Sequence, residues 1–151
     1  MEASFEYIIG NNGTEPESSY PYVGDKKPCR FNSSRSVGFT MNSYEFVEGD
    51  EETVKEALAT VGPLAVGING GLESFFNYWT GVYDDPECGG QLNHAVTLVG
   101  YGTDDSYSPP LDYWLLKNSW GKDWGEGGYI RLARGRNLCG ITSYVVYPIL
   151  N

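Results

Sequence analysis

Two apolar segments, each with a polar side chain at one end, constrain the fold of this sequence more than any other feature. The first, 94–101, begins with the only histidine of the chain, and the second, 113–118, ends in an asparagine. Both have the length and apolar content of buried strands. An imidazole and a carboxamide at the ends of neighbouring strands predict an oriented general base formed by His94 and Asn118.

Asn118 suits this role because its side-chain oxygen can accept the imidazole N–H and fix the tautomer without adding a buried charge. The indole of Trp120 can exclude water from that bond. The alternative is structural: a satisfied histidine, a turn asparagine and core tryptophans at positions 120 and 124. With one histidine and no Cys-x-x-Cys pair, a zinc site is not expected, and neither is a cofactor.

Length and charge narrow the class of protein. The 151 residues are enough for one domain, and 20 glycines with 12 tyrosines favour strands and turns over helix. With 20 acidic against 10 basic residues the net charge is −10, which argues against nucleic acid or an anionic membrane as a partner. No apolar run approaches the roughly 18 residues of a membrane span. Two Asn-x-Ser/Thr triplets, at 12–14 and 32–34, are compatible with the secretory route.

The clearest helix is predicted over 50–63. Asp50 can cap its N-terminus, and acidic residues in the first turn interact favourably with the helix dipole. Gly62 and Pro63 end the helix. Its buried face is predicted from apolar residues at i, i+3, i+4 and i+7, which are Val54, Ala57, Leu58 and Val61.

The other predicted elements are short. A mostly apolar helix is expected over 1–10, an irregular loop over 14–36 and a short aromatic helix around 75–78. Glycine-rich turns separate the strands, which favours a twisted antiparallel sheet or an open barrel. The strands are expected over 37–47, 64–69, 94–101, 113–118, 129–133 and 139–150.

Two sequence blocks resemble the papain family of cysteine peptidases, most closely its cathepsin L group. They are LNHAV at 92–96 and KNSWG at 117–121, the latter followed by WGEGGY at 124–129. They are similar to the family's histidine and asparagine blocks, and the matching segments follow the family order over the whole chain. Further matches are SSYPY at 18–22, GPLAV at 62–66, and NLCGI at 137–141 running to Tyr147-Pro148.

The resemblance implies a truncated papain-like fold of the α+β class. Its β-rich right domain, an antiparallel open barrel that includes the C-terminal strand, is expected over 37–151. Residues 1–36 are expected to be a helix and a loop that remain from the helical left domain.

The resemblance also implies roles for individual residues. His94 would be the imidazole of a thiolate–imidazolium pair, Asn118 its orienter, and Trp120 and Ser119 supporting neighbours. Cys88 and Cys139 match a disulfide of the second domain. Tyr144, large for the floor of the pocket that receives the substrate's P2 side chain, would make that pocket shallow or place a hydroxyl at its base. The implied substrate-binding residues are Gly67, Leu92, Asn93, Trp124 and Tyr144.

This chemistry requires a cysteine nucleophile, and none of the three cysteines of the chain matches it. No cysteine lies in a Cys-Gly-Ser-Cys-Trp context, and in such enzymes the histidine follows the nucleophile by roughly 130 to 150 residues. The nucleophile is therefore expected upstream of Met1. The counterpart of Cys29 in the family bridges to a cysteine of that leading part, which explains the odd number of cysteines; the alternative is a free surface thiol.

The function implied by the resemblance is that of a cysteine endopeptidase, with this chain as its C-terminal portion, inactive alone. Its partners would be a peptide or protein substrate, the missing N-terminal segment and cystatin-type inhibitors, in the lysosome or outside the cell. One alternative is a non-catalytic homologue that acts as a binding or structural protein. Another is a misassigned gene start with no stable product.

Overall fold

The computed structural model describes residues 1–150, which fall into two compact units. Unit 1 comprises Met1–Glu45 and the residues from Pro148 onward, and unit 2 comprises Phe46–Tyr147. The predicted histidine–asparagine site lies within unit 2. Unit 1 contains the first helix and the irregular loop that follows it.

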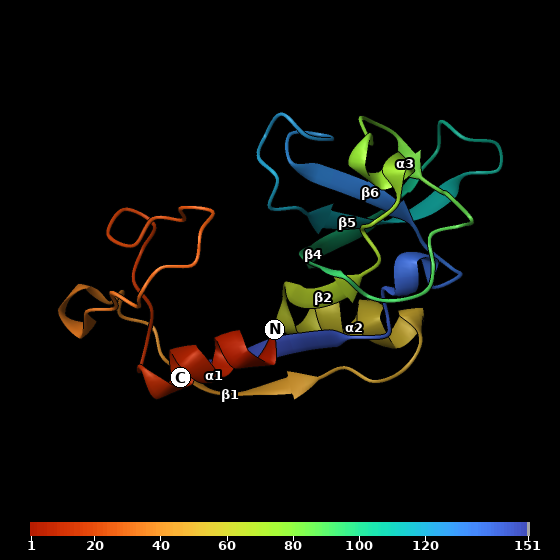
Figure 1. Cartoon of the computed structure of the whole chain (residues 1–151). Helices are drawn as coiled ribbons and strands as arrows, with labels where there is room; N and C mark the ends of the chain where they lie inside the picture. The colour runs from red at the N-terminus through yellow and green to blue at the C-terminus, as the bar shows by residue number, and fades with distance from the viewer. Residues whose placement is uncertain (151) are drawn as a thin grey trace. The chain divides into compact units, whose positions relative to one another are not determined.

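The elements are short helices and the strands of one sheet (Figure 1). The helices are α1 (Glu2–Gly10), α2 (Glu51–Val61) and α3 (Glu73–Phe76), with 3₁₀ turns η1 (Ser33–Arg35) and η2 (Leu138–Gly140). Among residues 1–150, no helix combines the length and apolar character needed to cross a membrane. The strands are β1 (Met41–Phe46), β2 (Leu64–Ile68), β3 (Val82–Tyr83), β4 (His94–Asp104), β5 (Leu111–Lys117), β6 (Tyr129–Ala133) and β7 (Val145–Leu150).

The sheet confirms the expected α+β class and adds one parallel pair. Its strand order is β1-β7-β2-β4-β5-β6-β3, and β2–β4, β4–β5 and β5–β6 are antiparallel. At one edge β3 pairs with β6 in parallel. Strands joined by a tight hairpin must be antiparallel, but β3 and β6 are far apart in sequence, so no turn constrains their relative direction.

Alternate residues of the central strands form the hydrophobic core of unit 2. Each strand places every second side chain on the same face, and the buried positions of β4, β5 and β6 follow this period. They are Val96 and Leu98 on β4, Trp114 and Leu116 on β5, and Ile130 and Leu132 on β6. His94 and Asn118, the polar residues at the ends of two of these strands, lie on the same face of the sheet and are partly or fully removed from bulk water.

Helix α2 confirms the helix predicted over 50–63, with the expected ends and with Val54 and Leu58 buried. Val61, predicted on the buried face, is instead exposed in the last turn. The Asp50 side chain accepts a hydrogen bond from the Thr53 N–H at 3.0 Å, and this bond lowers the pKa of Asp50 below its ordinary value. Gly62 follows the helix at φ 93°, a conformation that glycine adopts at little cost. The helix therefore begins and ends through local chemistry.

The last strand begins later than expected. Residues 138–140 form η2, with Asn137 and Cys139 at φ 52° and 56°, so the ladder resumes only at Val145. These left-handed residues turn the chain sharply, which apolar content alone does not reveal. Other strands also differ from their predicted bounds: β4 continues to Asp104 instead of ending at Tyr101, and β1 begins at Met41 instead of at residue 37. The two-residue strand β3 was not predicted.

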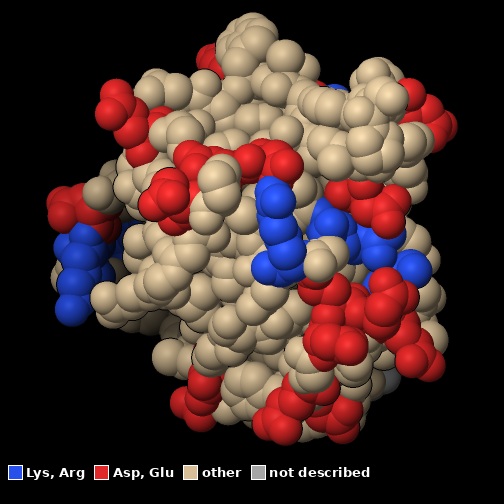
Figure 2. Space-filling view, turned by 90° about the vertical axis from the view of Figure 1, so that its right-hand side faces the viewer, with Lys and Arg blue, Asp and Glu red and all other residues tan. Residues whose placement is uncertain are grey.

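Acidic side chains predominate among the charged groups. Figure 2 shows one face on which Asp and Glu surround a smaller group of Lys and Arg. Arg134 illustrates how the few cations are used, since it pairs with Glu52 at 3.0 Å and with Asp112 at 2.9 Å. Such pairing leaves the surface with a net negative character, as the charge of −10 requires.

Glu51 joins α2 to the sheet through three hydrogen bonds. Its carboxylate accepts the Trp114 indole N–H at 2.8 Å and the backbone N–H groups of Gly135 and Asn137 at 2.7 and 3.2 Å. Trp114 is fully buried, so its indole nitrogen has no access to water. One side chain thus satisfies a core donor and anchors the 135–137 turn.

Substituting Glu51→Ala should lower the free energy of unfolding by about 1–3 kcal/mol, because it leaves the buried Trp114 donor without an acceptor. Urea unfolding followed by tryptophan fluorescence measures this loss. Glu56→Ala, an exposed position of the same helix, should change stability by no more than about 0.5 kcal/mol. Equal effects of the two substitutions would contradict the assignment.

Candidate active site

The pairing of β4 with β5 brings His94 and Asn118 together. Thr97 lies opposite Lys117 in this antiparallel pair, so the register places Val96 next to Asn118. Side chains two residues apart on a strand share a face, and His94 precedes Val96 by two residues. His94 is therefore a diagonal neighbour of Asn118 on the same face of the sheet.

The hydrogen bonds of Asn118 determine the tautomer of the histidine. His94 Nε2 lies 2.8 Å from Asn118 Oδ1, and the Ser119 backbone N–H donates to the same oxygen at 2.8 Å. A backbone N–H can only donate, so the shared atom must be the amide oxygen. His94 must then carry its proton on Nε2, which leaves Nδ1 of the neutral ring as a free acceptor and base.

The buried position of Asn118 lowers the stability of the folded chain. The residue is 6% exposed, and among residues 1–150 its amide nitrogen Nδ2 has no hydrogen-bond partner. An unsatisfied buried donor costs about 1–3 kcal/mol, which an apolar side chain would avoid. A polar group kept at such a position is typical of a functional site.

Aromatic side chains surround the imidazole. The ring centroid of Trp120 is 4.8 Å from that of His94, and Phe76 stacks on Trp120 at 5.0 Å. Phe75, fully buried, lies 6.2 Å from His94, and Trp124 lies 5.2 Å from Trp120. The Trp120 indole thus lies beside the His94 ring, and its role in shielding the His94–Asn118 bond from water stays a prediction.

Sequence reasoning assigned no site role to Phe75 and Phe76. Both come from α3, where the Phe76 carbonyl accepts the Trp124 indole N–H at 3.0 Å. The available signal was the run of aromatic residues at 75–78. It predicted a short helix, but a helix pattern does not state which distant side chains its aromatic face will contact.

Asn93 holds a glycine loop against His94. Its Oδ1 accepts the Gly70 N–H at 2.9 Å, and its Nδ2 donates to Asn69 Oδ1 at 3.0 Å. A Cβ atom on Gly70 would lie 2.9 Å from the His94 Cβ, closer than two carbon atoms tolerate. The backbone of this loop therefore packs directly on His94. The Asn93 side chain holds the loop there through its hydrogen bonds to Asn69 and Gly70.

Gly67, Leu92 and Tyr144 lie together, as their common assignment to a substrate pocket requires. The Gly67 N–H donates to the Tyr144 carbonyl at 2.9 Å. A Cβ atom on Gly67 would lie 3.2 Å from Leu92 Cδ1 and 3.3 Å from Tyr144 Cβ. Tyr144 also makes an edge-to-face contact with Phe46 at 5.6 Å. The depth of a substrate pocket at this place stays a prediction.

A disulfide joins Cys88 to Cys139 beside the glycine loop. The Cys139 N–H donates to the Cys88 carbonyl at 2.6 Å, and the Asn69 N–H donates to the Cys139 carbonyl at 2.8 Å. The disulfide thus stabilises the loop at 69–71, in which Gly70 packs against His94. Both sulfur atoms are consumed in the bond, so neither is available as a thiolate.

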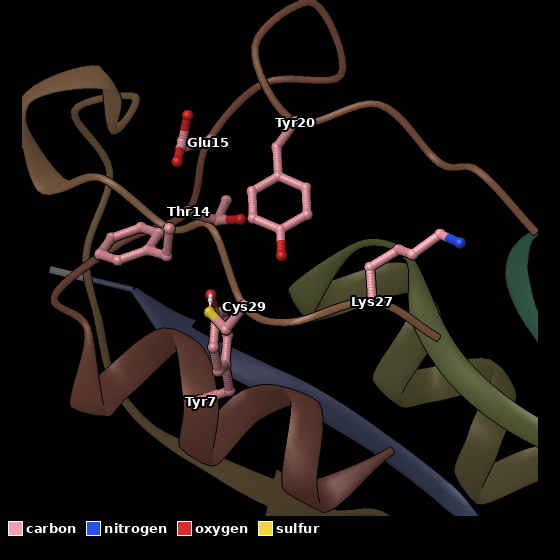
Figure 3. Close-up of a pocket in the computed structure, with 7 residues that line it drawn as sticks. Tyr7, Thr14, Glu15, Tyr20, Lys27 and Cys29 are labelled. Atoms are coloured by element: carbon pink, nitrogen blue, oxygen red, sulfur yellow. Dashed lines mark hydrogen bonds between the residues drawn. The ribbon is translucent and has the colours of Figure 1, made fainter. Parts of the chain in front are cut away.

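Cys29 is an exposed, unpaired cysteine of unit 1. It lines a cavity of about 420 Å³, in which its sulfur lies 3.7 Å from the Tyr7 hydroxyl (Figure 3). Hydrogen bonds from the Phe31 backbone N–H and then from Tyr7 lower the pKa of the Cys29 thiol below its ordinary value. A thiol of this kind is available for disulfide formation, the fate that the family resemblance implies.

Glu126 fixes the loop that carries Trp124. Its carboxylate accepts hydrogen bonds from Arg131 at 2.7 and 2.9 Å, from the Gly81 N–H at 3.0 Å and from the Thr80 hydroxyl at 2.9 Å. The Arg131 guanidinium, followed by the Gly81 and Thr80 donors, lowers the pKa of Glu126 to about 2 against the opposing effect of burial. The 121–128 loop is thereby tied to β6 and to the segment after α3.

Within residues 1–150, no group of three or more His, Cys, Asp or Glu side chains is placed to hold a metal ion. Nδ1 of His94 can accept a proton, and Nε2–H remains bonded to Asn118 whether the ring is neutral or protonated. The arrangement suits general acid–base catalysis.

Substituting Asn118→Ala should remove the preference for the Nε2–H tautomer, because the acceptor that selects it is lost. Imidazole nitrogen chemical shifts measure the tautomer, and the single histidine gives one pair of signals. The unsubstituted chain should show the proton on Nε2, and the variant a mixture. Asn42→Ala, at an exposed asparagine of β1, should leave the signals unchanged; a mixture already present without substitution would refute the assignment.

The stability that Glu126 contributes should be lost in acid. Its pKa falls from 4.5 to about 2 on folding, so the contribution is fully present above pH 4.5 and disappears as the pH falls toward about 2. Glu126→Gln should therefore flatten the fall in stability across this range in urea unfolding at several pH values. Glu56→Gln, at an exposed carboxylate, should retain the slope, and an unchanged slope in Glu126→Gln would count against the pair.

The chain matches the sequence profile described as papain family cysteine protease over residues 1–149. It is 49% identical to Cathepsin S of Mus musculus over 149 residues, which cover 98% of this chain and 43% of that protein. It is also 49% identical to Cathepsin L of Sarcophaga peregrina over 151 residues, with 98% and 43% coverage. The chain thus spans less than half the length of these relatives.

Solved structures agree with the sequence comparison. Digestive procathepsin L 3 of Tenebrio molitor larval midgut superimposes with a TM-score of 0.87 at 41% identity, covering 99% of this chain and 48% of that one. The procathepsin L2 proteinase of the same tissue gives 0.89 at 35% identity, with 99% and 46% coverage. The papain-like fold expected from the sequence is confirmed. From its profile match, its relatives and its fold, the chain belongs to the papain family of cysteine proteases.

Proposed function

We propose that this chain supplies the general base, and the residue that orients it, in a cysteine endopeptidase that cleaves peptide bonds by thiol acyl transfer. The observation that supports this most is the 2.8 Å contact between His94 Nε2 and Asn118 Oδ1, in which Asn118 also accepts the Ser119 N–H. It leaves His94 Nδ1 as the basic nitrogen. Such a base, held in one tautomer, is what activates a thiol for attack.

The proposed reaction begins with proton transfer from a cysteine thiol to His94 Nδ1, which forms a thiolate and an imidazolium. The thiolate attacks the peptide carbonyl carbon, and the imidazolium returns its proton to the leaving amine. Water, deprotonated by the same nitrogen, then releases the acyl group. Asn118 Oδ1 accepts Nε2–H throughout, and Trp120 shields that bond.

We propose that the nucleophile comes from a segment outside these residues, so that the chain alone has no peptidase activity. Cys88 and Cys139 are joined to each other, and Cys29 lies in a Pro-Cys-Arg context of unit 1. The proposal includes a peptide or protein substrate, cystatin-type inhibitors, and a lysosomal or extracellular location. It also includes a boundary between a remnant of the helical domain, residues 1–36, and the β-rich domain, residues 37–151. The residues proposed to contact the substrate are Gly67, Leu92, Asn93, Trp124 and Tyr144.

The test uses the full-length gene product that contains this chain and a fluorogenic peptide. His94→Ala should lower kcat/KM by about 10²–10⁴-fold, because the base is lost, and Asn118→Ala should lower it less. Asn42→Ala, at an exposed asparagine, should retain full activity. The isolated 151-residue chain should show no turnover.

Two results would contradict the proposal. Turnover by the isolated chain that a thiol-directed epoxide blocks would show that a cysteine within it is the nucleophile. Undiminished activity of His94→Ala in the full-length product would remove the proposed base. A full-length product without any peptidase activity, in which serine or glycine occupies the upstream nucleophile position, would favour the non-catalytic homologue.

A further inference from the structure

The two Asn-x-Ser/Thr triplets of unit 1 differ in their local structure. Asn32 precedes η1, is exposed, and uses its Oδ1 to accept both donors of Ser34, the backbone N–H at 3.0 Å and the hydroxyl at 2.8 Å. Within the described residues its amide nitrogen Nδ2 has no hydrogen-bond partner. The carboxamide is therefore held by its oxygen, with its nitrogen left free at the surface.

The triplet at Asn12 has no such arrangement. Asn12 lies just beyond α1 at φ 52°, with its backbone N–H bonded to the Ile9 carbonyl. Thr14 forms a β-bridge with Val37, and its side chain lines the cavity that contains Cys29 (Figure 3). Within the described residues no hydrogen bond joins the Thr14 hydroxyl to the Asn12 side chain.

The side-chain bonds of the Asn32 turn join residues that are neighbours in sequence, although in the folded chain the Asn32 backbone N–H also donates to Glu15 Oε1 at 2.7 Å. An asparagine side chain that bonds a backbone N–H two residues ahead forms an Asx turn, which requires no other part of the fold. It can form in a nascent chain as well as in the folded one. In the folded chain the exposed position of Asn32 gives an attached group room in solvent.

We propose that Asn32 is a site of N-linked glycosylation. An oligosaccharide carried on a polyprenyl pyrophosphate is the donor, and the oligosaccharyltransferase of the secretory route is the catalyst. The bond between Asn32 Nδ2 and the anomeric carbon forms as the bond from that carbon to the pyrophosphate oxygen breaks. One Nδ2 proton goes to an enzyme base, and the polyprenyl pyrophosphate leaves. The proposal rests on the secretory location proposed above.

Translation of the whole chain with microsomes tests the transfer directly. A secretory leader is added, and glycan attachment is measured as an endoglycosidase-sensitive mobility step. This step should be lost in Asn32→Gln and in Ser34→Ala, and retained in Ser34→Thr and Asn12→Gln. Ser34→Ala leaves Asn32 and its bond to the backbone N–H intact, so it removes only the hydroxyl that the triplet requires.

The site itself is identified by removing the glycan enzymatically in heavy-oxygen water, which converts a glycosylated asparagine into a labelled aspartate. The expected result is a peptide mass spectrum in which this labelled aspartate replaces Asn32. An unlabelled Asn32, or a mobility step that survives both Asn32→Gln and Ser34→Ala, would overturn the proposal. The assay requires neither folding nor peptidase activity, and the added leader makes it independent of the native location, so its failure is distinct from a failure of the proposed function.

Discussion

The register of β4 against β5 is the constraint on which the candidate site depends. Because Thr97 lies opposite Lys117, His94 and Asn118 become diagonal neighbours on the buried face. A shift of one residue would move one of them to the opposite face. The hydrophobic alternation of both strands resists such a shift, since it would expose Trp114 and Leu116. The core of unit 2 and the geometry of the base are thus set by one pairing.

Support for the base comes from segments on several sides of it. The loop at 69–71, held by Asn93 and by the Cys88–Cys139 disulfide, packs its backbone on His94. The aromatic group built on α3 and the 120–124 segment lies beside the ring. Glu126 and Arg131 secure the end of that segment. An imidazole restrained in this way loses little conformational entropy when it acts, which is the physical meaning of preorganisation at such a site.

Local chemistry explains which parts of the fold could be predicted. The capped helix α2 and the central strands follow from side-chain period and from hydrogen bonds between near neighbours. The late start of β7 was missed because two left-handed residues before it have no apolar signature. Strand β3 was not predicted, because two residues are too short to show a side-chain period, and its parallel pairing with β6 joins segments distant in sequence. Phe75 and Phe76 were identified as a helix but not as neighbours of His94.

The sequence by itself determined the residue types of the site, the polarity of the two strand ends and the family to which they point. Tertiary structure decided that Asn118 Oδ1 bonds both Ser119 N–H and His94 Nε2, and so decided the tautomer. It also decided that glycine is required at position 70, where a side chain would collide with His94. The reason is physical: period and propensity act over a few residues, whereas the contacts that His94 makes with Asn118 and Gly70 join chain segments more than 20 residues apart, whose distances exist only once the sheet has formed.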